Sequence, residues 1–408
     1  MTSSLLARRS SSGKAAQRIA ARIVGDVRRR GDRALFGWSR RLDGLELDAA
    51  TVWIQPEELR AARRKVSTEF LRAVEHAARN IRRVAERQLP CPWSLPVEPG
   101  VRVSQRVEPI EIVGCYVPGG RYSLVSTLLM TVIPARVAGV GRVVVACPRP
   151  STALLAAASV LGETEIARVG GAQAIAAMAY GTQSFPRVRK IFGPGNRYVT
   201  AAKQLVSGDC AIDMLAGPTE LLIVATRGNA RFIAADMLAQ AEHDPEALAL
   251  FVTTSRRLAH AVRAEIARQL RDLPAESPAA QALARSGPIL LARRLKDAVR
   301  FANRLAPEHL SLPGSEPGML RQIRAAGSIF LGPWSAQPLG DYAAGSNHVL
   351  PTNGVANARG GLSTTDFVRC ISVQEVTRAG LRQLGPVAMA LAGAEGLPAH
   401  RRAIEVRE

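Results

Sequence analysis

The chain has 408 residues, enough for two or three domains with large buried cores. Apolar residues make up 47% and charged residues 22%, as in ordinary globular proteins, which excludes a mainly disordered, collagen-like or coiled-coil chain. The net charge is +20, yet aromatic residues are only 4% and the arginines are spread along the chain. This pattern favours solvated helix faces over a nucleic-acid-binding surface, which we keep as the hypothesis from a second class of function.

The five cysteines form no CxxC pair, which predicts a reducing compartment and argues against a disulfide framework or a thiolate metal site. No uninterrupted apolar run reaches the roughly 18 residues of a membrane helix, so no membrane partner is expected. Residues 1–13 lack the apolar core of a secretion signal. We interpret them as a disordered or short N-terminal arm of a cytoplasmic protein.

Two amphipathic helices are predicted at the start of the chain. Apolar residues over 16–27 follow a period of 3.6 residues, and Gly31 ends this helix. A second apolar stripe over 59–84 predicts one longer helix that stops before Pro90.

Short β-branched runs then alternate with Ala-rich helical segments, which is typical of parallel sheets covered by helices on both faces. The expected strands are Ile110–Val117, Arg142–Cys147, Ile166–Val169, Lys190–Phe192, Leu221–Ala225, Leu248–Thr254, Ile289–Ala292 and Ser328–Gly332. The pattern predicts two doubly wound α/β domains. The last 45 or so residues read as helical and polar.

Three glycine-rich loops follow expected strands or open expected helices. They are Gly114–Arg121, Gly170–Gln173 and Phe192–Tyr198. None matches the G-x-G-x-x-G dinucleotide fingerprint, but glycines allow close backbone approach and a helix N-terminus presents free N–H groups to phosphate. Three such loops in one α/β unit predict a nucleotide or another phosphate-bearing ligand outside the carboxyl ends of the strands. Cys115 lies beside the first loop without a base, so we expect it to serve packing.

Histidine is scarce, and we interpret His76 and His260 as structural or surface residues. Gln240 and His243 are three residues apart on the helix expected from about residue 230, so their side chains are predicted to share one face. An imidazole and an amide oxygen are two ligands for one cation, although such a pair alone is weak evidence. Asp341 and His400 would complete an N/O ligand set for zinc or a similar metal.

Glu308 and His309 form an acid–imidazole pair directly after Pro307. Histidine titrates near neutrality, and a partly buried glutamate can be tuned towards it. Because consecutive side chains diverge, the two residues are expected to serve different steps rather than to form a hydrogen-bonded dyad. By itself the pair is also compatible with an ordinary helix start.

The chain resembles the histidinol dehydrogenase family from about residue 21 to its C-terminus. The most specific stretches are Gly114–Arg121, Ser126–Gly139, Phe192–Lys203, Ile212–Glu220, Ala239–Pro245, Ala306–Leu310 and Gly340–Thr352. The resemblance implies a zinc-dependent enzyme, with one Zn²⁺ per subunit, that oxidises L-histidinol to L-histidine through the aldehyde with two NAD. The runner-up is a paralogous zinc and NAD dehydrogenase for another small polar alcohol, such as a sulfonated diol.

The resemblance also implies the roles of individual residues. The acid/base pair would be Glu308 and His309, and the metal ligands would be Gln240, His243, Asp341 and His400. NAD contacts would fall on Tyr116, Gln173 and Asn196. Substrate contacts would fall on Thr219, Gln240, His243, His309, Asp341, Glu395 and His400. Thr219 departs from the serine usual at this point of the family, and its extra methyl group leaves the runner-up substrate open.

The fold implied is two incomplete Rossmann-like domains with small helical terminal segments. Residues 14–115 and 219–362 would form the metal and substrate domain, and residues 116–218 the NAD domain. Residues 363–408 would form a helical tail that reaches the partner subunit in an intertwined homodimer. Glu395 and His400 would then act in the partner's site.

Overall fold

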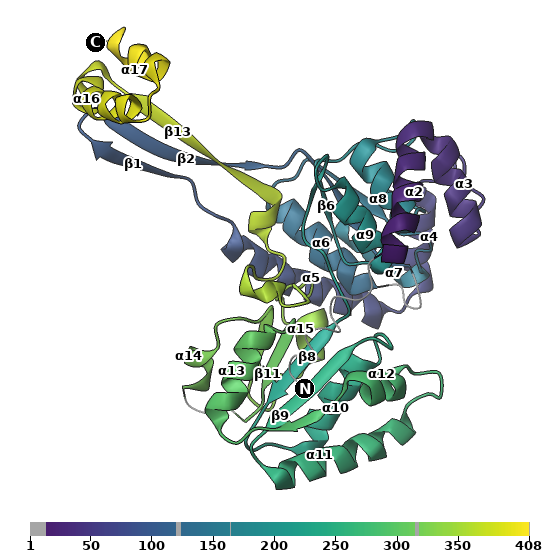
Figure 1. Ribbon diagram of the computed structural model, residues 1–408. Coiled ribbons are helices and arrows are strands. Elements are labelled where there is room, and N and C mark those ends of the chain that lie inside the picture. The colour runs from purple at the N-terminus through teal and green to yellow at the C-terminus, as the bar shows by residue number, and fades with distance from the viewer. Residues whose placement is uncertain (1–13, 120–123, 164, 315–317, 408) are drawn as a thin grey trace.

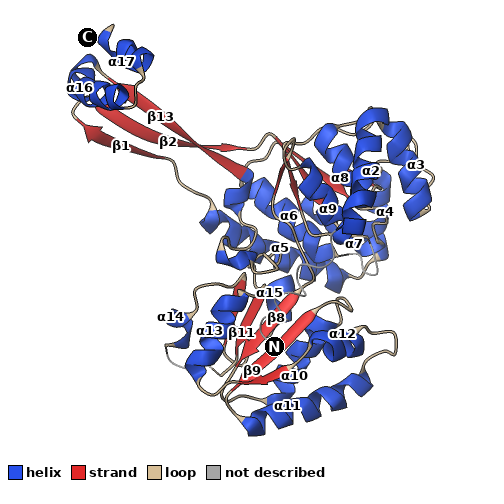
Figure 2. Cartoon of the chain, viewed as in Figure 1, coloured by secondary structure: helices blue, strands red, loops and turns tan. Residues whose placement is uncertain are grey.

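The computed structural model describes residues 14–119, 124–163, 165–314 and 318–407. Two α/β bodies lie against each other, and a long arm projects from one of them (Figures 1 and 2). The predicted N-terminal arm, 1–13, lies outside the described residues.

The first body is built on a five-stranded, wholly parallel sheet with the order β5-β4-β3-β6-β7. Its strands are β3 (Ile112–Tyr116), β4 (Arg142–Ala146), β5 (Ile166–Ala167), β6 (Lys190–Phe192) and β7 (Ala211–Ile212). The connecting helices are α6 (Val125–Val137), α7 (Thr152–Leu161), α8 (Gly171–Tyr180) and α9 (Arg197–Val206). This is the strand order of a dinucleotide-binding fold without its sixth strand, so the predicted incomplete doubly wound sheet is confirmed.

Four N-terminal helices pack on this first sheet. They are α2 (Lys14–Arg30), α3 (Asp32–Asp43), α4 (Pro56–Lys65) and α5 (Thr68–Gln88). The apolar faces of α2 and α5 enter the two cores on either side of the sheet. Grouping 14–115 with the second domain is therefore wrong, and the boundary at 115/116 cuts through β3, the central strand. The single helix predicted over 59–84 is also two helices, because Ser67 accepts a hydrogen bond from the backbone N–H of Phe70 and starts α5 afresh.

The second body repeats the same topology. Its parallel sheet has the order β10-β9-β8-β11-β12. The strands are β8 (Glu220–Val224), β9 (Leu248–Thr253), β10 (Ile289–Leu291), β11 (His309–Leu312) and β12 (Ser328–Leu331). The helical segments are α10 (Ala230–Ala241), α11 (Arg256–Gln269), η1 (Leu270–Asp272), α12 (Ala279–Ser286), α13 (Leu295–Leu305), α14 (Met319–Gln322) and α15 (Gln337–Tyr342). Separate apolar cores cover its two faces, so β8 and β9 are buried.

The arm joins two segments that are far apart in the sequence. The strands β1 (Trp93–Glu98), β2 (Val101–Pro109) and β13 (Val368–Val376) form an antiparallel sheet in that order, and α16 (Arg378–Ala394) and α17 (Pro398–Glu405) cover its tip. Two short 3-10 helices, η2 (Val355–Asn357) and η3 (Thr364–Phe367), lead into it. The predicted tail over 363–408 is thus not only helical, because nine of its residues pair with β2.

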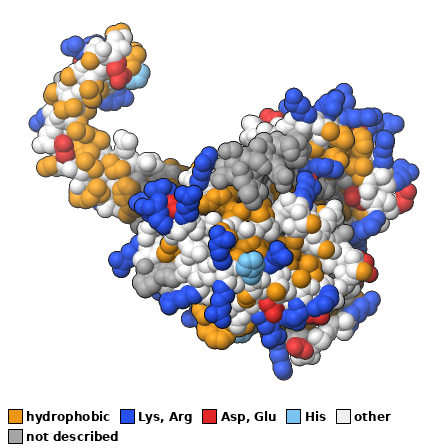
Figure 3. Space-filling view, turned by 60° about the horizontal axis from the view of Figure 1, so that its bottom comes forward, with side chains coloured by type: hydrophobic (Ala, Val, Ile, Leu, Met, Phe, Trp, Pro, Cys, Tyr) orange, Lys and Arg blue, Asp and Glu red, His pale blue; other side chains and the backbone are white. Residues whose placement is uncertain are grey.

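Apolar side chains lie exposed on the arm, where Figure 3 shows them along its length. They include Leu95, Val97, Val387, Leu391 and Val406. On the face of the bodies shown in the same view, arginine and lysine side chains are scattered among other types. No helix in the described part of the chain is long and apolar enough to cross a membrane.

Candidate active site

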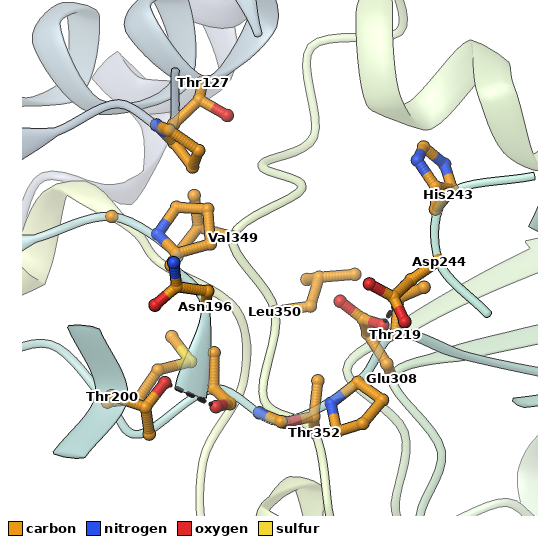
Figure 4. A pocket seen from close by; sticks show the side chains of 18 of the residues that line it. Thr127, Asn196, Thr200, Thr219, His243, Asp244, Glu308, Val349, Leu350 and Thr352 are labelled. Carbon is orange, nitrogen blue, oxygen red and sulfur yellow. Dashed lines mark hydrogen bonds between the residues drawn. The ribbon is translucent and has the colours of Figure 1, made fainter. Parts of the chain in front are cut away.

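A cavity of about 530 Å³ lies where the two bodies meet (Figure 4). On one side it is lined by the loop that follows β6, including Asn196. On the other side it is lined by residues that come directly before or begin β8 and β11, including Thr219 and Glu308. The expectation that ligand loops lie at the carboxyl ends of strands therefore holds for the first sheet, whereas the second sheet contributes its amino ends.

Glu308 and His309 are both buried in the wall of this cavity at the start of β11, which sequence reasoning had not recognised as a strand. Glu308 Oε2 accepts hydrogen bonds from the Thr219 hydroxyl at 2.6 Å and from the Glu220 backbone N–H at 2.8 Å. The same oxygen lies 3.5 Å from His309 Nδ1. The prediction that the two side chains diverge is wrong, since β11 begins at His309 and Glu308 turns back towards the ring.

The ring of His309 lies between two carboxylates. Its Nδ1 lies 3.1 Å from the Glu220 carbonyl oxygen, and its Nε2 lies 3.6 Å from Asp341 Oδ1. Burial opposes a charge on this ring, but Glu308 and Asp341 outweigh burial and raise the pKa of His309 to about 10. Burial likewise opposes a charge on Asp341, but the contact with His309 outweighs burial and lowers the pKa of Asp341. The site thus has an imidazole whose pKa is raised next to the Asp341 carboxylate, whose pKa is lowered.

Of the four predicted metal ligands, Asp341 contacts this histidine, with Oδ1 3.6 Å from its Nε2. Gln240 is fully buried, its amide nitrogen donates to the Thr219 hydroxyl, and its Oε1 has no hydrogen-bond partner. Asp341 and His243 line the cavity. His243 does not share a helical face with Gln240 as predicted, because α10 ends at Ala241 and His243 lies exposed in the following turn. A buried amide oxygen without a partner, an imidazole and a carboxylate are ligand types that suit a divalent cation.

The remaining predicted residues of this group lie elsewhere in the single chain. His400 belongs to α17 and Glu395 to the end of α16, both at the tip of the arm and away from the two bodies (Figure 1). Over residues 14–119, 124–163, 165–314 and 318–407, no three His, Cys, Asp or Glu side chains are placed to hold a metal ion.

The three predicted NAD contacts are divided between two places. Asn196 lines the cavity, where its side chain also caps α9 by accepting hydrogen bonds from the backbone N–H groups of Tyr198 and Val199. Tyr116 and Gln173 do not line the cavity; they are buried together near the start of α8. The Tyr116 hydroxyl accepts from the Gly171 N–H at 3.1 Å, and the Gln173 amide donates to Asp43 at 2.9 Å. The last two residues of the first glycine-rich loop lie outside the described residues.

The histidinol dehydrogenase family model matches residues 6–408. The chain belongs to the histidinol dehydrogenase family. The histidinol dehydrogenase of Halalkalibacterium halodurans is 46% identical over 393 residues, which cover 94% of this chain and 92% of that protein. The one from Geobacter sulfurreducens is 43% identical, over 99% of this chain and 96% of that protein. A crystal structure of histidinol dehydrogenase from Elizabethkingia anophelis has a TM-score of 0.94 at 37% identity, with 100% of this chain and 95% of that chain covered.

Membership of the histidinol dehydrogenase family makes the chain an NAD-dependent oxidoreductase. It also confirms the predicted mixed α/β architecture with parallel sheets. Cys115 is buried, and burial raises the pKa of its thiol to about 12, which agrees with a packing role and not with a nucleophile.

Sequence reasoning missed two polar groups in this dehydrogenase cavity. Gln337 is buried, its amide nitrogen donates to Asp341 Oδ2 and lies 3.5 Å from His309 Nε2, and its Oε1 has no partner. The spacing of four residues from Gln337 to Asp341 on a helix was a usable signal. His348 also lines the cavity and joins the two bodies, with Nδ1 3.0 Å from the Asp341 carbonyl oxygen and Nε2 3.3 Å from the Thr127 hydroxyl.

Proposed function

We propose that this cavity oxidises L-histidinol to L-histidine through L-histidinal with two NAD, as the last steps of histidine biosynthesis. The observation that carries the proposal is the buried group of Glu308, His309 and Asp341, which faces the loop at Asn196 across one cavity. The substrate comes from the family to which the chain belongs, and the geometry supplies the acid/base groups that both oxidations need.

In the first oxidation, the alcohol loses a hydride from its carbinol carbon and a proton from its hydroxyl group. NAD supplies the hydride acceptor. His309 takes the proton, since its Nε2 faces the cavity side near Asp341 while Nδ1 is held against the backbone of Glu220. The product is the aldehyde. A cation held by Asp341 would offset the negative charge that favours the imidazolium, which would lower the pKa of His309 and leave the ring able to accept a proton.

In the second oxidation, water adds to the aldehyde carbon, and a second hydride leaves the resulting hydrate for a second NAD. Glu308 is the base for the water. The Thr219 hydroxyl and the Glu220 N–H both bind one oxygen of Glu308, Oε2, and fix the orientation of the carboxylate. The product of this step is the carboxylic acid.

The metal would be held by Gln240 through its unpartnered Oε1, by His243 and by Asp341, with His400 of a second copy as the fourth ligand. Zinc bound there would orient the substrate and polarise the group that it contacts. Gln240 itself is oriented by its amide hydrogen bond to Thr219.

A dimer in which each arm completes the partner's site accounts for the place of Glu395 and His400. The arm exposes large apolar side chains that a stable monomer would bury, among them Leu391, which is 62% exposed. Coexpression of His309→Gln and His400→Asn chains tests this arrangement. Each variant alone is expected to be nearly inactive, whereas the mixed dimer has one intact site of two. Because random pairing makes half of the dimers mixed, the coexpressed enzyme is expected to recover about a quarter of the wild-type activity. No recovery in purified mixed dimers would contradict completion in trans.

The substrate is tested by initial rates of NADH formation with zinc-loaded enzyme. L-histidinol is expected to support turnover, and a sulfonated diol is not. Absence of NADH formation with L-histidinol would overturn the proposal, and faster turnover of the diol would favour the paralogous dehydrogenase instead.

A further inference from the structure

A buried ion pair in the cavity wall takes no part in the acid/base chemistry. Lys203 on α9 is 2% exposed and Asp213, just beyond β7, is 6% exposed. The Lys203 ammonium contacts Asp213 Oδ1 directly, and both residues line the cavity on the Asn196 side. Each charge is therefore removed from water, which is costly unless further hydrogen bonds compensate.

Three hydrogen bonds supply this compensation, and two of them involve the backbone of Gly193. Lys203 Nζ donates to the Gly193 carbonyl oxygen at 2.9 Å, and the Gly193 N–H donates to Asp213 Oδ2 at 2.7 Å. Asp213 Oδ1 also accepts from the Met214 N–H. The pair thus forms hydrogen bonds with both backbone polar groups of Gly193, its N–H and its carbonyl oxygen.

Gly193 is the residue at which the chain leaves β6 and turns along the cavity. Its φ is +109°, and a Cβ built there would lie 2.1 Å from the Tyr116 carbonyl oxygen, so only glycine fits. Three residues later, Asn196 caps α9 and lines the cavity. A strained turn held by two buried charges gives the loop 193–196 one fixed position.

Buried ion pairs can often be replaced by apolar side chains of similar volume with little loss of stability, so burial alone does not explain this one. Its two partners, Gly193 and Met214, both line the cavity, as the pair itself does.

We propose that Lys203 and Asp213 are positioning residues for the coenzyme: by fixing Gly193 they hold the loop 193–196 in the shape that binds the nicotinamide dinucleotide. This inference rests on the proposed function, in which the Asn196 side of the cavity receives NAD. It assigns the two residues an effect on coenzyme binding and none on histidinol binding.

The test compares coenzyme binding with substrate binding in variants of the whole enzyme. Lys203→Met alone leaves Asp213 buried without its counter-charge and can unfold the protein. The double variant Lys203→Met/Asp213→Leu replaces both charges by apolar side chains, so the protein is expected to stay folded. We expect the double variant to raise the KM for NAD and the Kd for NADH, measured by fluorescence titration, by about tenfold or more, since small misplacements of a binding loop have effects of this size. The KM for L-histidinol is expected to stay within about twofold.

The control is the pair Arg136 and Glu163, joined at 2.9 Å beside the same sheet but outside the cavity lining. Arg136→Met/Glu163→Leu is expected to change the Tm and leave the Kd for NADH unchanged. Equal weakening of NADH binding in both double variants, or a folded Lys203→Met/Asp213→Leu enzyme with wild-type Kd for NADH, would overturn the inference. If no form of the enzyme oxidised histidinol while the NADH titration still separated the two double variants, the proposed function would fail and the positioning role would stand.

Discussion

The hydroxyl of Thr219 donates a hydrogen bond to Glu308 Oε2 at 2.6 Å and accepts one from the amide of Gln240. One side chain therefore links the proposed base for water with the proposed metal ligand. The amide orientation that this contact imposes turns Gln240 Oε1, which has no partner, away from Thr219. A serine at this position would offer the same hydroxyl, so the extra methyl group of threonine leaves the link intact.

Replacement of Thr219 by valine tests this link at nearly constant volume. The variant loses both hydrogen bonds, and a bond to a carboxylate is worth about 1.5–3 kcal/mol, so kcat is expected to fall about tenfold or more. Thr219→Ser keeps the hydroxyl and is expected to retain most of the activity. Steady-state rates with L-histidinol and with L-histidinal measure the effect. Equal rates for the valine and serine variants would show that the hydroxyl does not matter.

Gln337→Leu removes the amide that donates to Asp341 while keeping a side chain of similar size. Groups that orient a metal ligand typically contribute about 10- to 100-fold to metal affinity, so zinc affinity is expected to fall about tenfold. Competition with a chromogenic chelator measures this affinity. Gln322→Leu, on α14, is the matched control, because the side-chain amide of Gln322 donates to the Gly318 carbonyl oxygen on the surface. Unchanged zinc affinity in Gln337→Leu would refute the orienting role of the amide.

Leu391→Glu places a charge on the exposed apolar face of α16. If this face is covered in a dimer, burying an unpaired charge is expected to destabilise the assembly by several kcal/mol and to lower activity with it. Sedimentation velocity at several protein concentrations measures the assembly. Gln383→Glu adds the same charge at an exposed polar position of the same helix and is expected to leave the dimer intact. A Leu391→Glu enzyme that remains dimeric and fully active would exclude this face from the interface.

Asp236, on α10, makes stability depend on pH. Burial raises the pKa of its carboxyl to about 7, above the ordinary 3.8. The folded state therefore binds more protons, and the stability that the neutral carboxyl contributes is lost as the pH rises through about 7. Asp236→Asn is expected to stabilise the protein by up to about 4 kcal/mol at pH 8, at about 1.4 kcal/mol per pKa unit, and by less at pH 5. Thermal unfolding at both pH values measures the difference, with the exposed Asp272→Asn as control. A variant with the wild-type Tm at pH 8 would contradict the raised pKa.

The two sheets were predictable because their strands are short, apolar runs separated by helices. Every predicted strand has a counterpart in the structure, since a strand buried on both faces carries its own signal in sequence. β11 was not predicted because the sequence before and at its start, Pro307, Glu308 and His309, is also typical of the first turn of a helix. The predicted domain boundary was wrong for a different reason. The apolar faces of the helices in residues 14–109 are visible in the sequence, but the sequence does not indicate which of the two sheets they cover.

The arm and the complete site depend on contacts that a single sequence does not display. β13 pairs with β2, which is more than 250 residues away in the sequence. Both strands contain charged residues, so their sequences resemble those of loops. His243 was placed on a helix because its spacing from Gln240 fits one, whereas α10 ends two residues earlier. The positions of Glu395 and His400 at the tip of the arm explain why no reasoning within one chain brings them to the cavity.

The most direct measurement is the yield of NADH per molecule of limiting L-histidinol, with the product analysed by chromatography, in zinc-loaded enzyme with excess NAD. Oxidation of both the alcohol and the aldehyde in one cavity predicts two NADH and one L-histidine for each L-histidinol consumed. One NADH with release of the aldehyde, or no NADH at all, would contradict it.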